Sequence, residues 1–299
     1  MLKTFSATKN FKYCAILSVL LVAAGLVALL AAPFGVNLFN LDIDFAGGTS
    51  FTYQLNEEVT PDVIDKVEDS VADVAGKTVS AVPTGDGTQV LIKTKNLSSE
   101  DREKLHEAMK TTFSLEDDAR QDVQNVSPAV GKDMQAAAVK SSLVAALLML
   151  LYITIRFDFK SGFAAVICLI HDVLVMISAY VIFQLPVNMN FIAAALTIFG
   201  YSINASIITF DRIRENQKLS RRESYDTIVD KSVRQSFTRN INTTLTTLFT
   251  IVLIIFTGVS SLVNFAIPIT VGIVSGAYSS IFVAAPLWAL LKKHQKKAK

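Results

Sequence analysis

Long apolar runs separated by short polar segments fill most of this chain, and one longer polar region interrupts them after the first run. Each run can cross a bilayer as a helix, since about 20 residues span the ~30 Å hydrocarbon core. The runs lie at 13–32, 136–155, 162–183, 190–211, 241–259 and 263–291. We therefore predict an α-helical polytopic membrane protein with six transmembrane helices. A cleaved signal peptide is the alternative for the first run, but the run exceeds the usual apolar core of about 7–15 residues.

The polar region, 33–135, has the pattern of one small α+β domain. Apolar residues alternate at Phe51, Tyr53 and Leu55, which indicates a strand with one buried face. The predicted elements are a strand at 50–55, a helix between Pro61 and Gly76, strands at 78–83 and 88–94 joined by a glycine-rich turn at 84–87, a helix capped by Ser98, and a strand at 119–126. This βαββαβ order predicts a ferredoxin-like split βαβ fold for the domain.

The distribution of charge predicts how the chain crosses the membrane. Basic residues mark the N-terminal segment 1–12, the turn at 156–160, the loop 212–240 and the tail 292–299, whereas the connections near 185–189 and 260–261 carry no charge. Segments rich in Lys and Arg stay in the cytoplasm. Both termini are therefore predicted to be cytoplasmic, in a protein of the cell's inner membrane, and the domain 33–135 lies outside. That domain holds 9 Lys/Arg and 19 Asp/Glu, net −10, against net +12 for the rest.

Composition and motifs exclude several classes of function. Hydrophobic residues make up 51% of the chain and charged residues 18%, and both cysteines, Cys14 and Cys168, lie in apolar runs. The sequence has no phosphate-binding GxxxxGK[ST], no HExxH, and no Ser/His/Asp or CxxC pattern, so we predict no catalytic residues, cofactor or metal. The basic loop is explained by membrane topology and does not indicate nucleic-acid binding.

A carboxyl group, Asp172, lies at the centre of the third run beside His171. A carboxyl near mid-membrane is costly, so it must be protonated or partnered. Two interpretations stay open: a residue of a proton path or of conformational coupling, and a structural hydrogen bond to a neighbouring helix or subunit. On a helix, His171 points about 100° away from Asp172, and we interpret it as structural.

The fifth run begins with Arg239, and Thr243, Thr246 and Thr250 follow on the same helical face, with Asn242 adjacent. This pattern is typical of a hydrated path through the bundle. The alternative is that the arginine reaches back to the cytoplasmic surface, as basic residues at span ends commonly do. Two polar residues of the fourth run, Ser202 and Asn204, are predicted to meet this face.

Other patterns favour structural roles. The run Asp211–Glu215 suits a salt-bridged helix end, and Ser220 with Glu223 has the spacing of a capping box. The helix after that box has an apolar stripe of Tyr225, Ile228, Val229 and Val233. In the sixth run, small residues four apart predict a ridge for close helix packing, namely Gly272, Gly276 and Ser280.

Five segments together resemble one known family. They are Asp42-Ile43-Asp44-Phe45-Ala46-Gly47-Gly48, His171-Asp172-Val173, Gly200-Tyr201-Ser202-Ile203-Asn204, Phe210-Asp211-Arg212-Ile213-Arg214-Glu215-Asn216 and Arg239-Asn240-Ile241-Asn242-Thr243-Thr244. In this order they resemble the SecF family, the smaller of the two membrane subunits, SecD and SecF, of the bacterial Sec protein-export machinery. The family is similar to the RND transporters, and the resemblance covers nearly the whole chain.

The resemblance implies a specific function and specific partners. A SecD partner would complete a pseudo-symmetric unit of which this chain is the RND-like half. The unit would use a proton or sodium gradient to promote late steps of preprotein export, after the ATPase SecA has pushed the preprotein through the SecYEG channel. Arg239 matches the family's transmembrane arginine in the ion path, so the ion-path or coupling residues implied are Arg239, Asp172, Asn204, Thr243 and Thr246.

Two departures from the family pattern leave alternatives open. Many relatives carry Asp where this chain has Ala205, so one acid of the usual relay is missing, and Ser127 replaces a frequent Gly. The partner's carboxylate would then act with Arg239, or the coupling would differ. The competing functions are half of an RND-type efflux pump for small molecules, which the small exterior domain disfavours, and a structural scaffold for the translocon, which Ala205 favours.

Overall fold

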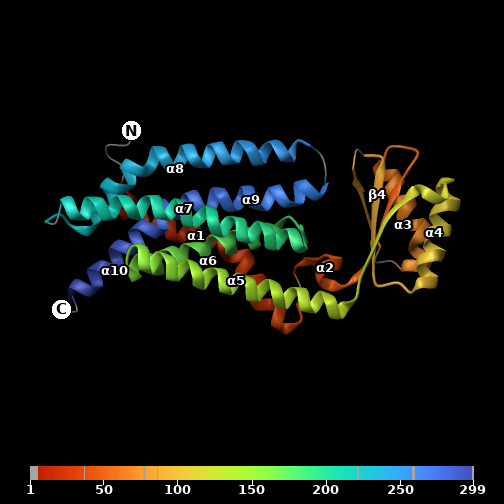
Figure 1. The fold of residues 1–299 in the computed structure, drawn as a ribbon, viewed down its shortest axis with the longest axis horizontal. Coiled ribbons are helices and arrows are strands. Elements are labelled where there is room, and N and C mark those ends of the chain that lie inside the picture. The colour runs from red at the N-terminus through yellow and green to blue at the C-terminus, as the bar shows by residue number, and fades with distance from the viewer. Residues whose placement is uncertain are drawn as a thin grey trace.

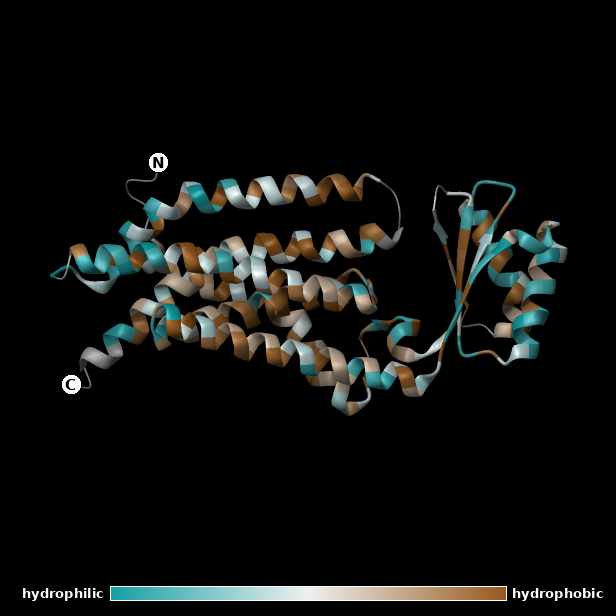
Figure 2. Cartoon of the chain, in the orientation of Figure 1, coloured by the Kyte–Doolittle hydropathy of each residue, from teal (hydrophilic) through white to brown (hydrophobic). Residues whose placement is uncertain are grey.

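A computed structural model describes residues 6–36, 38–76, 79–85, 87–220, 222–257 and 260–297. A bundle of long helices makes up one end of the molecule and a small unit of sheet and helices the other (Figure 1). Both chain ends lie at the end of the bundle that is farther from the sheet (Figure 1). Apolar residues concentrate along the bundle helices, and polar residues concentrate in the small unit and at the opposite end of the bundle (Figure 2).

The bundle contains the predicted apolar runs. Its elements are α1 Ala7–Ala31, α5 Pro128–Arg156, α6 Phe159–Ile182, α7 Met189–Leu219, α8 Tyr225–Ile255, α9 Ser260–Ser279, a π-helical turn Ser280–Ala284 and α10 Ala285–Lys297. Five stretches of the described residues are long and apolar enough to cross a membrane: Ala7–Phe34, Pro128–Arg156, Phe159–Ile182, Met189–Leu219 and Leu262–Lys293. The chain is therefore a multi-pass membrane protein.

The fifth predicted span, 241–259, falls mostly in α8, which is not among those five. The first half of this helix carries charged residues, and its second half is rich in threonine, so no stretch of it is as apolar as the others. The end of the run, Gly258 and Val259, lies outside the described residues. The count of six remains a prediction.

The small unit has the predicted order of strands and helices. Its elements are β2 Gly48–Gln54, α3 Pro61–Ala75, β3 Ser80–Thr84, β4 Gln89–Thr94, α4 Ser99–Phe113, a 3₁₀ turn Asp117–Ala119 and β5 Arg120–Val126. The sheet order is β3-β4-β2-β5, and every neighbouring pair is antiparallel. Thr78 and Asp86, which belong to a predicted strand and turn, lie outside the described residues.

The core of this unit lies between one face of the sheet and the two helices. Phe51, Tyr53 and Leu55 are buried there, as their alternation predicts, and they pack against the valine stripe of α3 and against Leu105 and Met109 of α4. Burial raises the pKa of the Tyr53 hydroxyl well above its ordinary value. Its oxygen lies 3.2 Å from Nδ1 of the buried His106.

A short connector joins the sheet unit to the bundle. It consists of β1 Asn40–Leu41, which pairs in parallel with β6 Pro186–Val187 of the α6–α7 connection, and of the one-turn helix α2 Ile43–Ala46. The helix packs against the start of α5. Because β6 follows α6 and precedes α7, the connector joins the sheet unit to the end of α6 and the start of α7.

Glycines allow the bundle helices to approach closely. A Cβ added to Gly25 of α1 would lie 2.7 Å from the Leu174 carbonyl oxygen and 2.9 Å from the Ser178 hydroxyl of α6. Gly272 and Gly276 of α9 face Ile198 and Ser202 of α7 in the same way, so the predicted small-residue ridge is confirmed.

The prediction of a capping box at Ser220 and Glu223 is wrong. Ser220 ends α7, its N–H bonding the Asn216 carbonyl at 2.8 Å, and Ser224 caps α8 by accepting a bond from the Thr227 N–H at 3.2 Å. The segment 212–240 is therefore mostly two helix ends rather than a loop. The helix α7 continues beyond its apolar run because Ile213 and Asn216 are buried in the bundle.

We predict that Gly25→Ala lowers the thermal stability of the chain, because the added methyl group must separate α1 from α6; overpacking of this kind costs about 1–3 kcal/mol. The matched control is Gly200→Ala, since nothing lies within 4 Å of a Cβ added there. Thermal unfolding of the purified chain in detergent checks both. An unchanged midpoint for Gly25→Ala would contradict the packing described here.

Candidate functional site

The Asp172 carboxyl is fully buried at the middle of α6, accepts hydrogen bonds from three serine hydroxyls and lies within hydrogen-bond distance of a histidine nitrogen. Its Oδ1 accepts from the Ser275 hydroxyl at 2.6 Å and lies 2.9 Å from Nδ1 of His171. Its Oδ2 accepts from the Ser202 hydroxyl at 2.5 Å and the Ser279 hydroxyl at 2.8 Å. A buried carboxylate needs such donors, because the lipid supplies none. This cluster, which we call the Asp172 site, joins α6, α7 and α9.

Local features of α9 bring its two serines to the carboxyl. Ser275 and Ser279 are four residues apart and therefore share a helical face. Gly276 lies between them, and a Cβ there would come within 3.3 Å of Ser202 and 3.6 Å of an Asp172 oxygen. The π-helical turn Ser280–Ala284 begins directly after the site. Such turns are frequent at functional sites, so the change of helix type marks this position.

The interpretation of His171 as a residue that points away from Asp172 is wrong. The backbone directions of neighbours on a helix differ by about 100°, but rotation about the side-chain bonds brings Nδ1 of His171 back to the carboxyl at 2.9 Å. The imidazole ring also lies 6.1 Å from the Tyr278 ring. Its Nε2 is buried and has no hydrogen-bond partner among the described residues. The histidine thus presents one unused polar atom within the bundle.

The arginine face of α8 lies on the outside of the bundle and not at the Asp172 site. Arg239, Asn242 and Thr246 are exposed and Thr243 is half-buried. The hydroxyls of Thr243 and Thr246 donate to carbonyls one turn earlier in their own helix, at 2.8 and 3.1 Å. Asn204 is also exposed. Within the described chain, no hydrogen bond or ion pair connects this face to Asp172.

Other polar side chains join α7 to α8. Asn216 donates to the Ser232 hydroxyl at 2.8 Å and to Oε1 of Gln235 at 2.7 Å, and Arg212 donates to the same Gln235 oxygen at 2.8 Å. Deeper in the bundle, Asn240 donates to the Thr209 hydroxyl at 3.1 Å. Sequence reasoning missed these partners, which span two helices and have no common spacing.

In the segment Asp211–Asn216, some residues make polar contacts with other described residues and one does not. Arg212 pairs with Glu215 at 2.5 Å, as a salt-bridged helix end predicts. Among the described residues, Arg214 donates only to the Arg156 carbonyl, at 3.1 Å. Asp211 is exposed and makes no hydrogen bond or ion pair with another described residue.

The segment Asp42–Gly48 forms the connector between the bundle and the sheet unit. Asp42 caps α2 by accepting the Ile43 N–H at 2.8 Å, and its Oδ2 accepts from Lys93 of β4 at 2.7 Å and from Asn188 at 3.1 Å. Asp44 accepts the Met189 N–H at 3.0 Å, at the start of α7. These carboxylates therefore link the sheet unit to the α6–α7 connection.

The two glycines of that segment are required by their backbone. Gly47 has φ +78°, and a Cβ there would lie 2.8 Å from Pro128, where α5 begins. Gly48 has φ +159°, and a Cβ there would lie 2.5 Å from the Thr94 carbonyl oxygen. Only glycine combines a positive φ with such close backbone approach.

Gly200 and Tyr201 of α7 differ in their surroundings. Gly200 is exposed, and an added Cβ would meet nothing within 4 Å, so no contact inside this chain explains the small residue. Tyr201 is half-buried and packs against the apolar cluster that includes Met176 and Ile198.

We predict that Ser202→Ala destabilises the chain, because a buried carboxylate loses one donor; a hydrogen bond to a charged group contributes about 1.5–3 kcal/mol. Ser206→Ala is the matched control. This hydroxyl is buried one turn further along α7 and has no hydrogen-bond partner among the described residues, so its removal costs little. Thermal unfolding of the two variants in detergent measures the difference, and equal midpoints would contradict the described role of Ser202.

Comparison with known proteins shows the family of the chain. The sequence model of the family described as "Protein export membrane protein SecD/SecF, C-terminal" matches residues 104–294. The protein translocase subunit SecF of Alicyclobacillus acidocaldarius is 34% identical over 299 residues, which cover 98% of this chain and 94% of that protein. The protein translocase subunit SecDF of Bacillus subtilis is 34% identical over 97% of this chain, but the match covers only 38% of the relative.

A solved structure agrees with these sequence matches. The crystal structure of SecDF from Thermus thermophilus, described as a translocon-associated membrane protein, superposes with a TM-score of 0.84 and 33% sequence identity. The match covers 98% of this chain and 39% of that one. The chain thus spans about two fifths of the SecDF relatives and nearly the whole length of SecF. It belongs to the SecD/SecF family of protein-export membrane proteins.

Proposed function

We propose that this chain is the SecF-type subunit of a bacterial protein translocase, and that with a SecD-type partner it uses a proton or sodium gradient to promote late steps of preprotein export. The names of its relatives, protein translocase subunits SecF and SecDF, support the export function. In the SecDF relatives, the part that matches this chain makes up only 38% and 37% of the protein. The remaining, longer part of those proteins supports a SecD-type partner for this chain. The SecYEG channel, the ATPase SecA acting indirectly, and unfolded preproteins are the further partners proposed.

The observation that carries the partner proposal is the polar face of α7 and α8. Arg239, Asn242, Thr246 and Asn204 are exposed on helices that run along the apolar bundle, and lipid offers such groups no hydrogen-bond partner. Gly200 lies on the same stretch of α7 with open space before it. A second membrane protein that covers this face would satisfy the polar groups and use the close approach that a glycine permits.

The proposed topology has six spans, with α8 as the fifth. Its second half lies along the bundle beside the other helices (Figure 1), and its polar residues would face the partner instead of lipid. Both termini lie at the basic end of the bundle, which supports a cytoplasmic location for them, and the acidic sheet unit lies at the other end (Figure 1).

We further propose that the sheet unit is ferredoxin-like, supported by parallel β2 and β3 on either side of β4.

The mechanism proposed for the Asp172 site follows from its hydrogen bonds. Three hydroxyl donors and a histidine nitrogen surround one carboxyl group, and a protonated carboxyl becomes a donor itself. Protonation would therefore displace one of the four and loosen α6 from α7 or α9. The nearby titratable groups are His171, whose Nε2 is unpartnered, Tyr278 and the buried Cys168. Ions would reach the bundle along the arginine face of α8 and the partner's side chains, since Ala205 offers no carboxylate.

Movement could pass from this site to the exterior sheet through the connector. Asp172 lies at the centre of α6 and bonds Ser202 near the centre of α7, and the segment between the two helices contacts Asp42 through Asn188. Asp42 in turn bonds Lys93 of the exterior sheet. A shift between the two helices would therefore displace the sheet unit, as coupling between two packed states requires.

A structural scaffold is the alternative that the Asp172 site itself favours. All four of its polar partners come from this chain, so both carboxyl oxygens are partnered without any movement. In that case Asp172 would hold the bundle together and carry no ion.

We predict that Arg239→Ala abolishes the gradient-dependent part of preprotein export and leaves membrane insertion of the chain intact, because the arginine carries the only charge on the polar face of α8. Lys231→Gln, two turns earlier on the same helix, is the matched control. The measurement is a pulse-chase of a secreted preprotein in cells depleted of the native chain, with and without the proton gradient. Unchanged stimulation in Arg239→Ala would rule out the ion-path role.

A further inference from the structure

A cavity of about 680 Å³ opens at the basic end of the bundle, far from the Asp172 site. It lies between the α5–α6 turn, the end of α7, the start of α8 and α10. Its volume falls within the usual range of sites for small molecules, about 300–1,000 Å³. Neither the export function nor the partner surface proposed above uses it.

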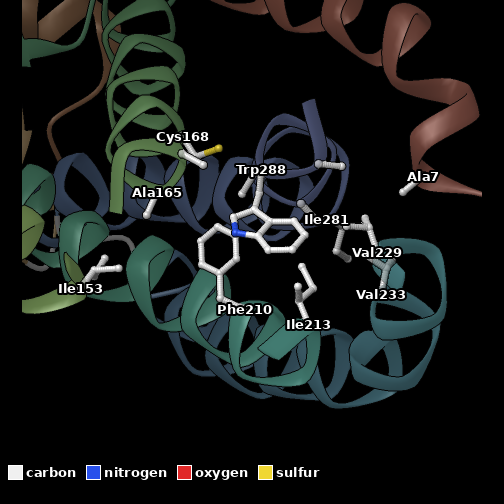
Figure 3. Close-up of a cluster of buried hydrophobic side chains, with 14 of the residues drawn as sticks. Ala7, Ile153, Ala165, Cys168, Phe210, Ile213, Val229, Val233, Ile281 and Trp288 are labelled. Carbon is white, nitrogen blue, oxygen red and sulfur yellow. The ribbon is translucent and has the colours of Figure 1, made fainter. Parts of the chain in front are cut away.

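The floor of the cavity is apolar and aromatic. Trp288 lines it and is buried, with Phe210 and Ile213 of α7 close to the indole (Figure 3). Tyr225 meets the indole edge-on, with ring centroids 5.8 Å apart and an angle of 88° between the rings. The indole N–H of Trp288 donates no hydrogen bond to any described residue. An occupant of this floor would need apolar surface and could use one more acceptor.

The rim of the cavity is cationic. Arg214 and Lys218 are one turn apart on α7 and both line it. Arg214 donates one bond, to the Arg156 carbonyl at 3.1 Å, and Lys218 has no hydrogen bond or ion pair with another described residue. Much of the donor capacity of this pair, above all the remaining N–H groups of the guanidinium, is therefore unused inside the chain.

The acidic groups at the rim do not cancel these charges. Burial acts to raise the pKa of the Asp158 carboxyl. Hydrogen bonds from Lys292 and from the Ser161 hydroxyl and N–H nevertheless hold this pKa below its ordinary value. Asp158 forms an ion pair with Lys292, whose Nζ lies 2.5 Å from Oδ2. A further rim cation, Lys293, pairs with Asp226. Glu223 is the one lining carboxylate that has no ion pair within the described chain, against two such cations.

We propose that this cavity binds an anionic phospholipid, with the phosphate between Arg214 and Lys218 and the glycerol and first acyl carbons against the half-buried Tyr225, beside the buried Trp288 and Phe210. Three observations carry the assignment together: an unneutralised pair of cations, an aromatic floor with a spare N–H, and a position at the end of a membrane bundle, where lipid phosphates lie. Basic pockets between transmembrane helices on the cytoplasmic side bind such headgroups. A free phosphate ion would leave the apolar floor unused.

The experiment uses the single tryptophan of the chain, Trp288. Its fluorescence reports on the cavity directly, because a brominated acyl chain quenches it only on close approach. The full chain is reconstituted in phosphatidylcholine vesicles that contain a minor fraction of either brominated phosphatidylglycerol or brominated phosphatidylcholine. We expect the anionic lipid to quench at a mole fraction at least about fivefold lower, since one basic side chain at an anionic surface contributes about that factor.

Variants separate the site from the general charge of the surface. Lys218→Gln and Arg214→Gln should each reduce the preference for phosphatidylglycerol about fivefold. Lys218 makes no hydrogen bond or ion pair with another described residue, so this variant keeps the test independent of folding. Lys231→Gln, a cation at the same end of the bundle but outside the cavity, should keep the full preference. Equal quenching by the two lipids, no quenching by either, or an equal loss in all three variants would overturn the proposal.

Inorganic phosphate distinguishes the two sources of the anion. Added to vesicles with brominated phosphatidylglycerol, it should not relieve quenching more than chloride of the same ionic strength does. Relief by phosphate alone would mean that the cavity takes a soluble phosphate, and the lipid assignment would fail.

Discussion

The need to satisfy one buried carboxyl group constrains the whole bundle. Asp172 has no access to solvent, and a charge without donors in such a place costs several kcal/mol. Its donors come from α6, α7 and α9, so the rotation and depth of these three helices are fixed relative to one another. The glycines of α9 serve the same requirement, since they bring the serines within hydrogen-bond distance. The π-helical turn follows where α9 leaves the site.

The other polar residues of the bundle are arranged around this fixed centre. Asn216, Ser232 and Gln235 hold α7 and α8 together at the basic end, and Asp42 with Asn188 and Lys93 holds the sheet unit at the other. The polar groups of α8 that remain exposed have no such role inside the chain. Their exposure is the reason to expect a second subunit, since a helix of this composition is unstable against lipid.

Much of the fold could be predicted from the sequence because its signals are local. Alternation at Phe51, Tyr53 and Leu55 and the capping pair of Ser98 and Asp101 depend on neighbouring residues, and both are present as predicted. Five of the six predicted apolar runs likewise lie in helices of the described chain that are long and apolar enough to cross a membrane. The capping box at Ser220 failed because tertiary contacts of Ile213 extend α7 past the end of its apolar run.

The candidate site was harder to predict because its contacts join residues that are far apart in the sequence. Asp172 could be singled out as a carboxyl in an apolar run, but Ser275 and Ser279 lie 103 and 107 residues away and are ordinary small residues of a membrane helix. His171 was misjudged because helical spacing gives the direction of the backbone and not of the rotated side chain. The face of Arg239 was recognised by its spacing, whereas its separation from Asp172 depends on how α8 packs.

The central claim is that the Asp172 carboxyl changes its protonation state when the exterior is acidified and thereby loosens its helices. Infrared difference spectroscopy of the chain in membranes together with a SecD-type partner tests this directly. The account predicts that acidification of the exterior produces the carbonyl band of a protonated carboxyl, and that this band is absent in Asp172→Asn. A spectrum without the band, or a band that persists unchanged in Asp172→Asn, would contradict it and leave Asp172 as a fixed structural link.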